Sequence, residues 1–288
     1  MRNVVMRFNV IGAGRLGKNI ALALTNSGLA RLAAVCNTTL DSAEQAIQQI
    51  GSGFAVPHLA ELPKVNLTFI TTPDDLIFSI AEQLKEQVPT DSVIVHCSGV
   101  LSSAELMPLK TRGCHIASLH PLKAFSEGNL DQGAFMHCDC VIEGDELAVE
   151  LLTPLFTKLG ARIIPINADG KAIYHAAAVI ASNYLVTLAA TAADLLQESG
   201  IEANLAQQMI VNLMTSSLNN VQQASEIKNA LTGPLARGDL NTINRHLKAL
   251  KNCFANELYR HAALATLPIT DLDTTLKNAL TVLLEKDV

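Results

Sequence analysis

The sequence contains no tryptophan, and its few Tyr and Phe residues amount to 4% of a 288-residue chain. The hydrophobic cores must therefore be built mainly from Ala, Leu, Ile and Val, a composition that suits closely packed helices. Charged residues are also scarce, at 17%, whereas 49% of the chain is hydrophobic, and this balance excludes a mainly disordered protein. Because single cores rarely grow beyond roughly 150 to 200 residues, we expect two domains.

Clusters of positive charge are missing as well. The net charge is −6, from 21 basic and 27 acidic residues, with no Lys/Arg cluster longer than a pair, so the sequence predicts no nucleic-acid partner. The apolar run after Arg2 and Arg7 is interrupted within a few residues by Gly-Ala-Gly, too early for the hydrophobic region of a signal peptide. We therefore expect a cytoplasmic protein.

The six cysteines occur at scattered spacings, which is typical of reduced thiols rather than of a disulfide framework. Cys138 and Cys140 follow His137, but in a strand the two cysteines merely share a face. No second ligand pair follows at the spacing of a zinc site. We predict no metal site.

One stretch, residues 176–193, carries no charge and reaches the length of a membrane span. Polar residues interrupt it at Ser182, Asn183, Thr187 and Thr191. Alanine, which is frequent in this stretch, contributes little to membrane insertion. We therefore expect no membrane segment here, but a helix that is buried between other helices.

The first part of the chain alternates short apolar runs with helical patterns, which is typical of βαβ units and a parallel sheet. The strands are expected at residues 8–11, 32–36, 67–71, 92–96, 114–119, 138–142 and 162–166. The helices are expected at residues 15–27, 40–50, 103–111 and 146–159, with another opened by Pro73 and Asp74. Beyond residue 167 only helical periods remain. We predict an α/β domain with a doubly wound, mostly parallel sheet over residues 1–167 and an all-α domain over residues 168–288.

The first expected strand runs directly into a glycine-rich segment and then into a helix, and the segment consists of Gly12, Ala13, Gly14, Arg15, Leu16 and Gly17. This context distinguishes a dinucleotide-binding Gly-x-Gly-x-x-Gly from a chance match. Gly12 permits the tight turn, Gly14 lets the backbone approach a pyrophosphate, and Gly17 lets the helix pack against its strand. The segment therefore predicts a Rossmann domain that binds a dinucleotide.

An acidic residue that accepts the ribose 2′-hydroxyl of NAD normally stands about 20 residues further on, at the end of the second strand. That place is taken by Asn37, Thr38 and Thr39. Because a carboxylate would repel a 2′-phosphate, its absence favours NADP, with Asn37 and Thr38 donating hydrogen bonds and Arg15 supplying charge. NAD remains the alternative, since no Arg follows the second strand, and FAD is less favoured.

Residues that follow the strands are the next candidates, because parallel sheets bind ligands at the carboxyl ends of their strands. The residues expected near the ribose and nicotinamide are Thr72, Pro73, Ser98 and Gly99. His120 follows a later strand and is our candidate proton donor, since His titrates near working pH. The alternative is a structural histidine that bonds to a loop carbonyl.

Tyr174, His175 and Asn183 are polar residues in the apolar stretch that opens the helical domain. His175 and Asn183 are eight residues apart, which is about 80° around a continuous helix, so both are expected to face one cleft. We assign His175 and Asn183 to the catalytic group and Tyr174 to substrate binding. Hydrogen bonding within the core is the alternative for each.

Several segments together resemble a known family, namely the glycine-rich segment, His-Cys-Ser-Gly at 96–99, Ser-Leu-His-Pro-Leu at 118–122, Tyr-His-Ala-Ala at 174–177 and Leu-Thr-Gly-Pro-Leu-Ala-Arg-Gly-Asp at 231–239. The chain resembles largely uncharacterised bacterial proteins that join a Rossmann-like NADP-binding domain to a helical domain of unknown function. These belong to the 6-phosphogluconate dehydrogenase-like superfamily. More distantly, the chain is similar to pyrroline-5-carboxylate reductase, deazaflavin-dependent NADP reductases and β-hydroxyacid dehydrogenases.

The resemblance implies hydride transfer and homodimers built through the helical domain. A Thr-rich helix start contacts the substrate in the reductases, which by position implies Thr232 and Gly233 here, although a turn between helices is the alternative. The β-hydroxyacid dehydrogenases place a catalytic Lys one turn before an Asn. If Asn183 is that Asn, the Lys position falls at Val179, and Lys171 lies three turns away.

These features together predict an NAD(P)-dependent oxidoreductase. It would transfer a hydride between NADP(H) and a small C=O or C=N substrate in the cleft between the two domains. The alternative is a dinucleotide-binding sensor or scaffold without catalysis.

Overall fold

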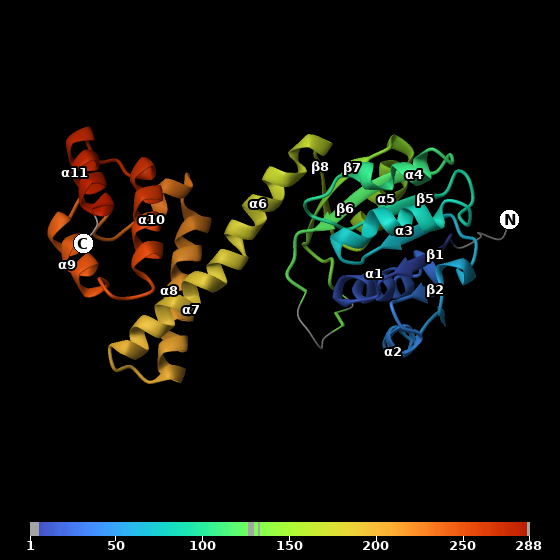
Figure 1. Ribbon diagram of the computed structural model, residues 1–288, viewed down its shortest axis with the longest axis horizontal. Coiled ribbons are helices and arrows are strands. Elements are labelled where there is room, and N and C mark those ends of the chain that lie inside the picture. Colours follow the sequence, from blue (N-terminus) through green and yellow to red (C-terminus); the bar gives the residue numbers. More distant parts are fainter. Residues whose placement is uncertain (1–5, 126–129, 132, 287–288) are drawn as a thin grey trace. The chain divides into compact units, whose positions relative to one another are not determined.

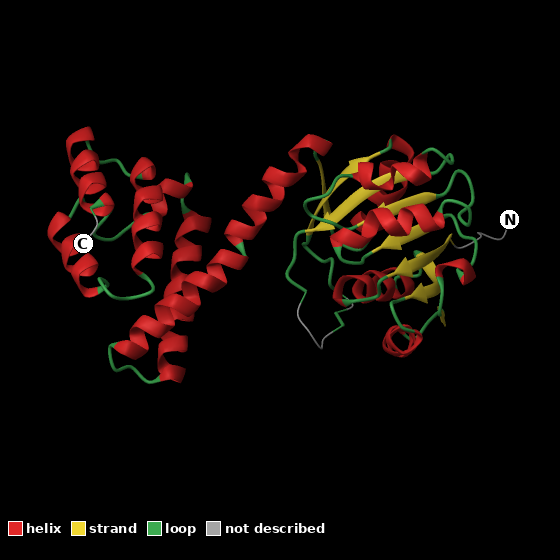
Figure 2. Cartoon of the chain, in the orientation of Figure 1, coloured by secondary structure: helices red, strands yellow, loops and turns green. Residues whose placement is uncertain are grey.

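The computed structural model describes residues 6–125, 130–131 and 133–286. The chain divides into two compact units, Met1–Asn183 and Tyr184–Val288. The first contains all the strands of the described chain, and the second is made of helices and loops (Figure 2). The predicted fold class, an α/β domain followed by a helical region, is confirmed.

The first unit is built on an eight-stranded sheet (Figure 1). Its strands are β1 (Met6–Ile11), β2 (Ala30–Cys36), β3 (Phe54–Val56), β4 (Leu67–Ile70), β5 (Val93–His96), β6 (His115–Pro121), β7 (Asp139–Gly144) and β8 (Arg162–Pro165). The order across the sheet is β3-β2-β1-β4-β5-β6-β7-β8, and every neighbouring pair is parallel except β6 and β7. The sequence did not predict β3, because a three-residue edge strand is too short to show a period of two.

Two groups of helices cover opposite faces of the sheet, which makes it doubly wound. The helices of this unit are α1 (Arg15–Asn26), α2 (Leu40–Ile50), α3 (Ile77–Leu84), α4 (Met107–Lys110), α5 (Glu146–Lys158) and α6 (Lys171–Ala181). Residues of α1, α2 and α5 share one core with the sheet, and residues of α3 and α4 share the other. Val10 and Ile11 of β1 face these two cores in turn, because successive side chains of a strand point to opposite faces.

The second unit contains α7 (Asn183–Glu198), α8 (Ala203–Gln223), α9 (Leu240–Ala249), α10 (Asn256–Thr266) and α11 (Thr274–Glu285), with α7 starting at the boundary residue. Ile243, Ala263 and Leu280 are buried in its core, so that α9, α10 and α11 pack on one another. Asp239 and Asp273 cap α9 and α11, because their side chains accept backbone N–H groups of the first helical turn. Short 3-10 helices occur at η1 (Leu59–Glu61), η2 (Asp74–Leu76), η3 (Ser103–Leu106), η4 (Ala168–Gly170), η5 (Ile227–Ala230) and η6 (Leu267–Ile269).

The change from strands to helices and the limit of the compact first unit fall at different places. The last strand, β8, ends at Pro165, close to the boundary predicted at residue 167. The first unit nevertheless continues to Asn183, and hence includes α6. The reason is Lys171, which is buried at the start of α6 and ties this helix to the ends of the sheet strands.

One prediction about the apolar stretch is wrong. Taken as one helix, Ala168–Glu198 is long and apolar enough to cross a membrane by length and composition. Its most apolar 18 residues have a mean hydropathy of 1.5, and none of them is buried. Ile173, Ile180 and Val186 are 76%, 62% and 68% exposed. The core of the second unit draws on α9, α10 and α11.

Candidate functional site

The glycine-rich segment forms the turn between β1 and α1, and each glycine meets a different steric demand. Gly12 has a φ of +84°, and a Cβ there would lie 2.6 Å from Thr72 Cγ2. A Cβ on Gly17 would clash with Thr71 Oγ1, so Gly17 lets α1 pack closely on the strand ends. A Cβ on Gly14 would meet only Gly12 O, at 4.0 Å. The space beside Gly14 is therefore open, as the approach of a pyrophosphate requires.

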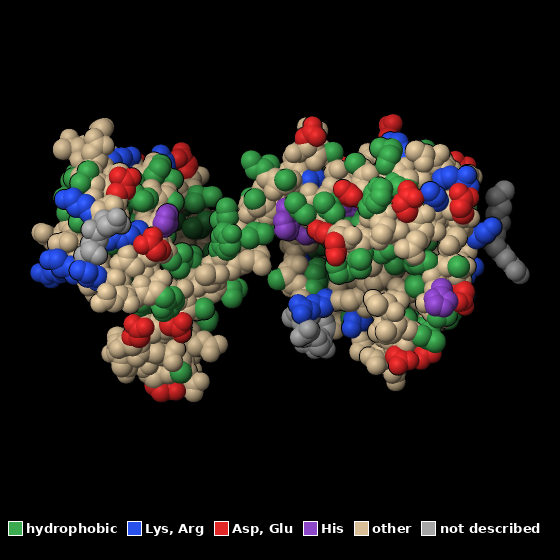
Figure 3. Space-filling view, in the orientation of Figure 1, with side chains coloured by type: hydrophobic (Ala, Val, Ile, Leu, Met, Phe, Trp, Pro, Cys, Tyr) green, Lys and Arg blue, Asp and Glu red, His purple; other side chains and the backbone are tan. Residues whose placement is uncertain are grey.

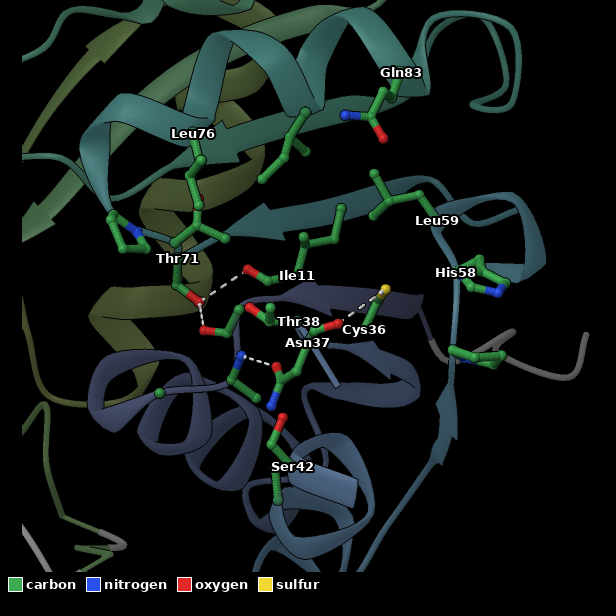
Figure 4. Close-up of a pocket in the computed structure, with 18 of the residues that line it drawn as sticks. Ile11, Cys36, Asn37, Thr38, Ser42, His58, Leu59, Thr71, Leu76 and Gln83 are labelled. Atoms are coloured by element: carbon green, nitrogen blue, oxygen red, sulfur yellow. Dashed lines mark hydrogen bonds between the residues drawn. The ribbon is translucent and has the colours of Figure 1, made fainter. Parts of the chain in front are cut away.

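Residues at the ends of the neighbouring strands hold this turn in place. The Thr71 hydroxyl donates to Gly12 O at 2.8 Å, and the backbone N–H of Ala13 donates to Asn37 Oδ1 at 2.7 Å (Figure 4). The Asn37 oxygen is thus used within the protein, and its NH2 group remains as a donor. The ends of β2 and β4 therefore position the glycine turn of β1.

A cavity of about 960 Å³ opens beside the turn and is lined from the ends of β1, β2 and β4 and from α1, α2 and α3. The strand order reverses between β1 and β4, which is where open α/β sheets bind their ligands. The sequence-predicted residues that line it are Gly12, Ala13, Gly14, Asn37, Thr38, Thr72 and Pro73. The cavity volume suits a ligand the size of a dinucleotide.

The wall of this cavity carries no negative charge in the part of the chain that the structure describes, since no Asp or Glu lines it. Lys18 and His58 do line it, and Lys18 Nζ donates to Gln49 Oε1 at 2.8 Å. The Thr72 hydroxyl is buried without a hydrogen-bond partner among the described residues. A wall of this kind suits an anionic ligand that brings hydrogen-bonding groups of its own.

Other predicted cofactor residues lie outside the lining of this cavity. Arg15 is exposed at the first position of α1, and Leu16 packs against the core. Gly17 serves the packing of α1, as described above. Ser98 and Gly99 lie in the loop after β5, next to a second group of polar side chains.

This second group is organised by Lys171, which is 1% exposed. Its Nζ donates to the backbone oxygen of Ser98 and to the hydroxyl of Ser118, both at 2.7 Å. Burial lowers the pKa of Lys171. The ammonium joins the loop after β5 to β6 and to α6, so it assembles the site from three distant parts of the chain.

The loop after β5 is also held from its other side. The Ser98 hydroxyl donates to Asp74 Oδ2 at 2.8 Å and accepts the backbone N–H of Leu101 at 2.9 Å. The buried His96 bonds through Nε2 to Ser102 O at 2.9 Å, and its Nδ1 accepts the N–H of Ser98 at 3.2 Å. The loop that carries Ser98 and Gly99 is therefore rigidly positioned.

His120, Tyr174 and His175 come together against this loop. The Tyr174 hydroxyl lies 2.8 Å from His120 Nδ1, and the rings of His120 and His175 are 5.9 Å apart, edge to face. A Cβ on Gly99 would clash with His175 Cδ2 and lie 3.0 Å from His120 Nε2. Only a glycine at position 99 leaves room for both imidazoles.

Burial determines the protonation states of His120 and Tyr174. Burial, with smaller effects of the Lys171 and His175 charges, lowers the pKa of His120 to about 4. Burial raises the pKa of Tyr174 to about 12. At neutral pH His120 is therefore an uncharged imidazole, and Tyr174 keeps its proton.

Asn183 lies at the start of α7, next to the end of α6. The expected angle of about 80° assumes a continuous helix. The structure interrupts the helix at Ser182, between the end of α6 at Ala181 and the start of α7. Asn183 is exposed there, and its Oδ1 accepts the Ser182 hydroxyl at 3.0 Å.

Thr232 and Gly233 lie in the second unit. Thr232 lines a cavity of about 440 Å³, together with residues of α7, α9 and α10. Gly233 has a φ of +97° in the connection between η5 and α9, a conformation that favours glycine in a turn.

Sequence reasoning assigned no role to Lys171, although the structure places it at the centre of the second group. A signal was present, because Lys171 precedes Tyr174 and His175 by three and four residues, which puts all three on one helical face. The catalytic lysine of the β-hydroxyacid dehydrogenases was sought one helical turn before Asn183. Counting back from Asn183 gave Val179, so Lys171 was not considered for this role.

These features define a Rossmann-type nucleotide-binding domain followed by a helical domain. Family models agree with this, since residues 1–121 match the Rossmann-like domain. Residues 138–266 match a domain of unknown function, DUF2520. The chain thus combines a Rossmann-like N-terminal domain with a DUF2520 C-terminal domain, as the resemblance predicted, and the DUF2520 match begins at β7, inside the sheet.

Solved structures share the fold along nearly the whole chain. A protein from Thermotoga maritima is 25% identical, with a TM-score of 0.69 over 96% of this chain and 98% of its own. A Bacteroides fragilis protein, provisionally named as an NADP oxidoreductase, is 24% identical, with a TM-score of 0.76 over 93% and 99%. A Plasmodium falciparum pyrroline carboxylate reductase with NADP bound is 12% identical, with a TM-score of 0.61 over 98% and 99%. No curated protein matches the chain.

Proposed function

We propose that the protein is an oxidoreductase that transfers a hydride between NADP(H) and a small C=O or C=N substrate. The observation that carries this proposal is the glycine turn, which leaves the space beside Gly14 open next to a cavity of about 960 Å³ at the point where the strand order reverses. The names of the Bacteroides and Plasmodium proteins, which share the fold, support the same class of cofactor.

NADP is proposed over NAD because of the charges in the cavity. No carboxylate occupies the end of β2, where Asn37 and Thr38 offer neutral donors, and Lys18 is the cation in the described lining. A 2′-phosphate would gain from these groups, whereas the 2′-hydroxyl of NAD would find no acidic acceptor.

One set of residues would bind the cofactor, and a second set would act on the substrate. The glycine turn, with the N-terminus of α1, would bind the pyrophosphate, and Asn37 and Thr38 would bind the adenosine ribose. The dinucleotide supplies the hydride when it is bound. His120 and His175 would face the substrate beside Gly99, and His120 would hold the proton for the reduced atom.

Binding of the cofactor can be tested without a known substrate. NADPH, NADH and FAD are titrated into the protein by calorimetry, and each titration is repeated with Gly14→Asp, in which a carboxylate blocks the approach to the turn. Asn26→Asp is the control, because it places the same charge on an exposed residue at the far end of α1. NADPH binding that is lost only in Gly14→Asp supports the proposal, whereas no binding of any dinucleotide contradicts it.

Turnover is the second step of this test. Small carbonyl compounds and imines are offered with the bound cofactor, and its absorbance is followed. If NADPH binds but no compound is reduced, while NADPH changes the state of association, a dinucleotide sensor replaces the oxidoreductase. Loss of turnover in both His120→Ala and His175→Ala would support the assigned roles.

We further propose that the chain is a soluble, cytoplasmic homodimer that uses its helices as the interface. Val186, Val211 and Leu213 on α7 and α8 are 68%, 56% and 65% exposed. Apolar patches of this kind mark contacts with other molecules. A second copy is favoured over a membrane, because polar residues and the break at Ser182 interrupt the apolar stretch.

A further inference from the structure

His120 and Tyr174 are 54 residues apart in the sequence and form a close pair in the first unit. The Tyr174 hydroxyl lies 2.8 Å from Nδ1 of His120, and the two rings meet edge to face with centroids 5.7 Å apart. Lys171, one helical turn before Tyr174, is anchored on Ser98 and Ser118. This anchor sets the position of α6, so the hydroxyl is held at Nδ1 by the fold itself.

The direction of this hydrogen bond and the tautomer of His120 are linked, because each fixes the other. A neutral imidazole has one protonated nitrogen and one acceptor nitrogen, and a phenol has one proton to donate. In the part of the chain that the structure describes, Nδ1 of His120 is the hydrogen-bond partner of the Tyr174 hydroxyl. If Tyr174 donates to Nδ1, the proton of His120 must be on Nε2.

Nε2 points toward the backbone of the loop after β5. A Cβ on Gly99 would lie 3.0 Å from both Nε2 and Cε1 of His120, so this edge of the ring faces position 99. The carboxyl end of β5 is at the edge of the sheet where ligands of parallel sheets bind. Nε2 therefore faces the edge at which a substrate is expected.

The groups that surround the ring keep it uncharged. Lys171 and His175 on α6 disfavour a positive charge on His120, and Asp74 at the start of η2 favours it weakly. Burial of the imidazole is the largest of these effects and lowers the pKa of His120 to about 4. A neutral imidazole carries its proton on either Nδ1 or Nε2, and its hydrogen bonds determine which of the two tautomers is favoured.

We infer that Tyr174 is a positioning residue that holds His120 in the neutral tautomer with its proton on Nε2. The sequence analysis assigned Tyr174 to substrate binding, and this inference gives its hydroxyl a different task. The value of the tautomer for catalysis rests on the proposed function, but the tautomer itself does not.

The proton balance of a reduction follows from this arrangement. In such a reduction the bound dinucleotide would supply the hydride, and the carbonyl oxygen would take the Nε2 proton of His120. Nδ1 takes the hydroxyl proton of Tyr174, which leaves a phenolate that water reprotonates. With a pKa of about 12 this phenolate forms more readily than an alkoxide, given that water itself has a pKa of about 15.7.

The test is nitrogen NMR of the full-length protein labelled in its eight histidines, since long-range proton–nitrogen correlations separate protonated from unprotonated ring nitrogens. His120 is assigned by the signals that disappear in His120→Gln. At pH 7 the wild type is expected to show a protonated Nε2 and an unprotonated Nδ1. In Tyr174→Phe we expect a mixture of both tautomers and a higher pKa of His120, because the bond that stabilises the neutral ring is gone.

The second unit offers a matched control. His246 Nδ1 and the Tyr259 hydroxyl form the same pair, 2.9 Å apart with ring centroids at 5.7 Å. Tyr259→Phe should alter the signals of His246 and leave those of His120 unchanged.

A wild-type His120 with its proton on Nδ1, or a Tyr174→Phe spectrum with an unchanged His120, would overturn the inference. If Tyr174→Phe does not fold, Tyr174→Leu, which also lacks the hydroxyl, takes its place, and a wild-type Nδ1 proton overturns the inference in either case. The experiment needs neither cofactor nor substrate. A protein that binds no dinucleotide but has the expected tautomer would therefore refute the proposed function and leave this inference standing.

Discussion

The side-chain oxygen of Asn37 accepts the backbone N–H of Ala13 at 2.7 Å and so joins the end of β2 to the glycine turn. A carboxylate oxygen at the same position could accept the same hydrogen bond. The charge at position 37 can therefore be changed while the turn stays in place. This separates the two tasks of the residue, which are to hold the turn and to select the cofactor.

Asn37→Asp should weaken the binding of NADPH by at least about tenfold and leave that of NADH nearly unchanged, because a carboxylate repels the 2′-phosphate and accepts the ribose hydroxyl of NADH. Calorimetric titration with both dinucleotides measures the ratio. Asn37→Ala is the control, since it removes the bond to Ala13 and should weaken both ligands together. Equal losses for both ligands in Asn37→Asp would show that position 37 does not select the cofactor.

Gly14 and Gly17 should respond in opposite ways to substitution by Ala. Gly17→Ala puts a Cβ against Thr71 Oγ1 and within 2.8 Å of Gly12 O, so the free energy of unfolding should fall by about 1–3 kcal/mol. Gly14→Ala meets nothing closer than 4.0 Å and should change stability by less than about 0.5 kcal/mol, while NADPH affinity drops. Urea unfolding and calorimetry of the two variants check this. A Gly14→Ala protein that binds normally would argue against a pyrophosphate at the turn.

His96 should make the protein less stable in mild acid. Its ring is fully buried, and burial lowers its pKa from 6.5 to about 4. The unfolded chain takes up a proton below pH 6.5 and the folded chain only near pH 4. Stability that is complete above pH 6.5 is therefore lost as the pH falls toward 4, by up to roughly 3 kcal/mol for this residue. His120 adds a loss of the same sign.

Urea unfolding at pH 7.0 and pH 4.5 measures this loss. His96→Gln has no imidazole to titrate, so its stability should depend less on pH over this interval, even if it is less stable at pH 7.0. The explanation fails if the wild type and His96→Gln lose equal stability between the two conditions.

Lys171→Met should raise the pKa of His120, because it removes a positive charge that disfavours the imidazolium. It should also lower the free energy of unfolding by about 1–3 kcal/mol, since Ser98 O and the Ser118 hydroxyl lose their buried partner. NMR titration of His120 and urea unfolding are the measurements. Lys158→Met, at the exposed end of α5, is the control and should change neither.

Leu213→Glu should convert the proposed dimer into a monomer, because it places a charge in the exposed apolar surface of α8. Sedimentation equilibrium at micromolar concentration gives the mass of each protein. Phe78→Glu is the control, since Phe78 is 51% exposed on α3 in the other unit and should not alter association. A wild-type chain that sediments as a monomer would refute the dimer.

Much of the first unit could be predicted because its signals are local. Apolar runs of four to six residues became strands, and the helix predicted at residues 40–50 became α2 with the same bounds, since Thr39 caps its start and Gly51 its end. The glycine turn was also visible, because the spacing of its glycines between a strand and a helix is a local pattern. Such features depend on residues that are close in the sequence.

The second group of site residues was only partly predictable, because it depends on contacts between distant segments. His120, Tyr174 and His175 could be named as candidates by type, but their pairing required α6 to lie against the loop after β5. The break at Ser182 also separated Asn183 from the position that a continuous helix would have given it. An angle calculated along one helix cannot anticipate such a break.

By itself, therefore, the sequence determined the doubly wound α/β fold, the helical region after it and the glycine turn, since periodicity and glycine spacing are local patterns. Only the tertiary structure decided that Lys171 is buried between Ser98 and Ser118 and that Tyr174 meets His120. The physical reason is that burial and hydrogen bonding of these side chains depend on strands and a helix that are more than 50 residues apart and come together only when the sheet is complete.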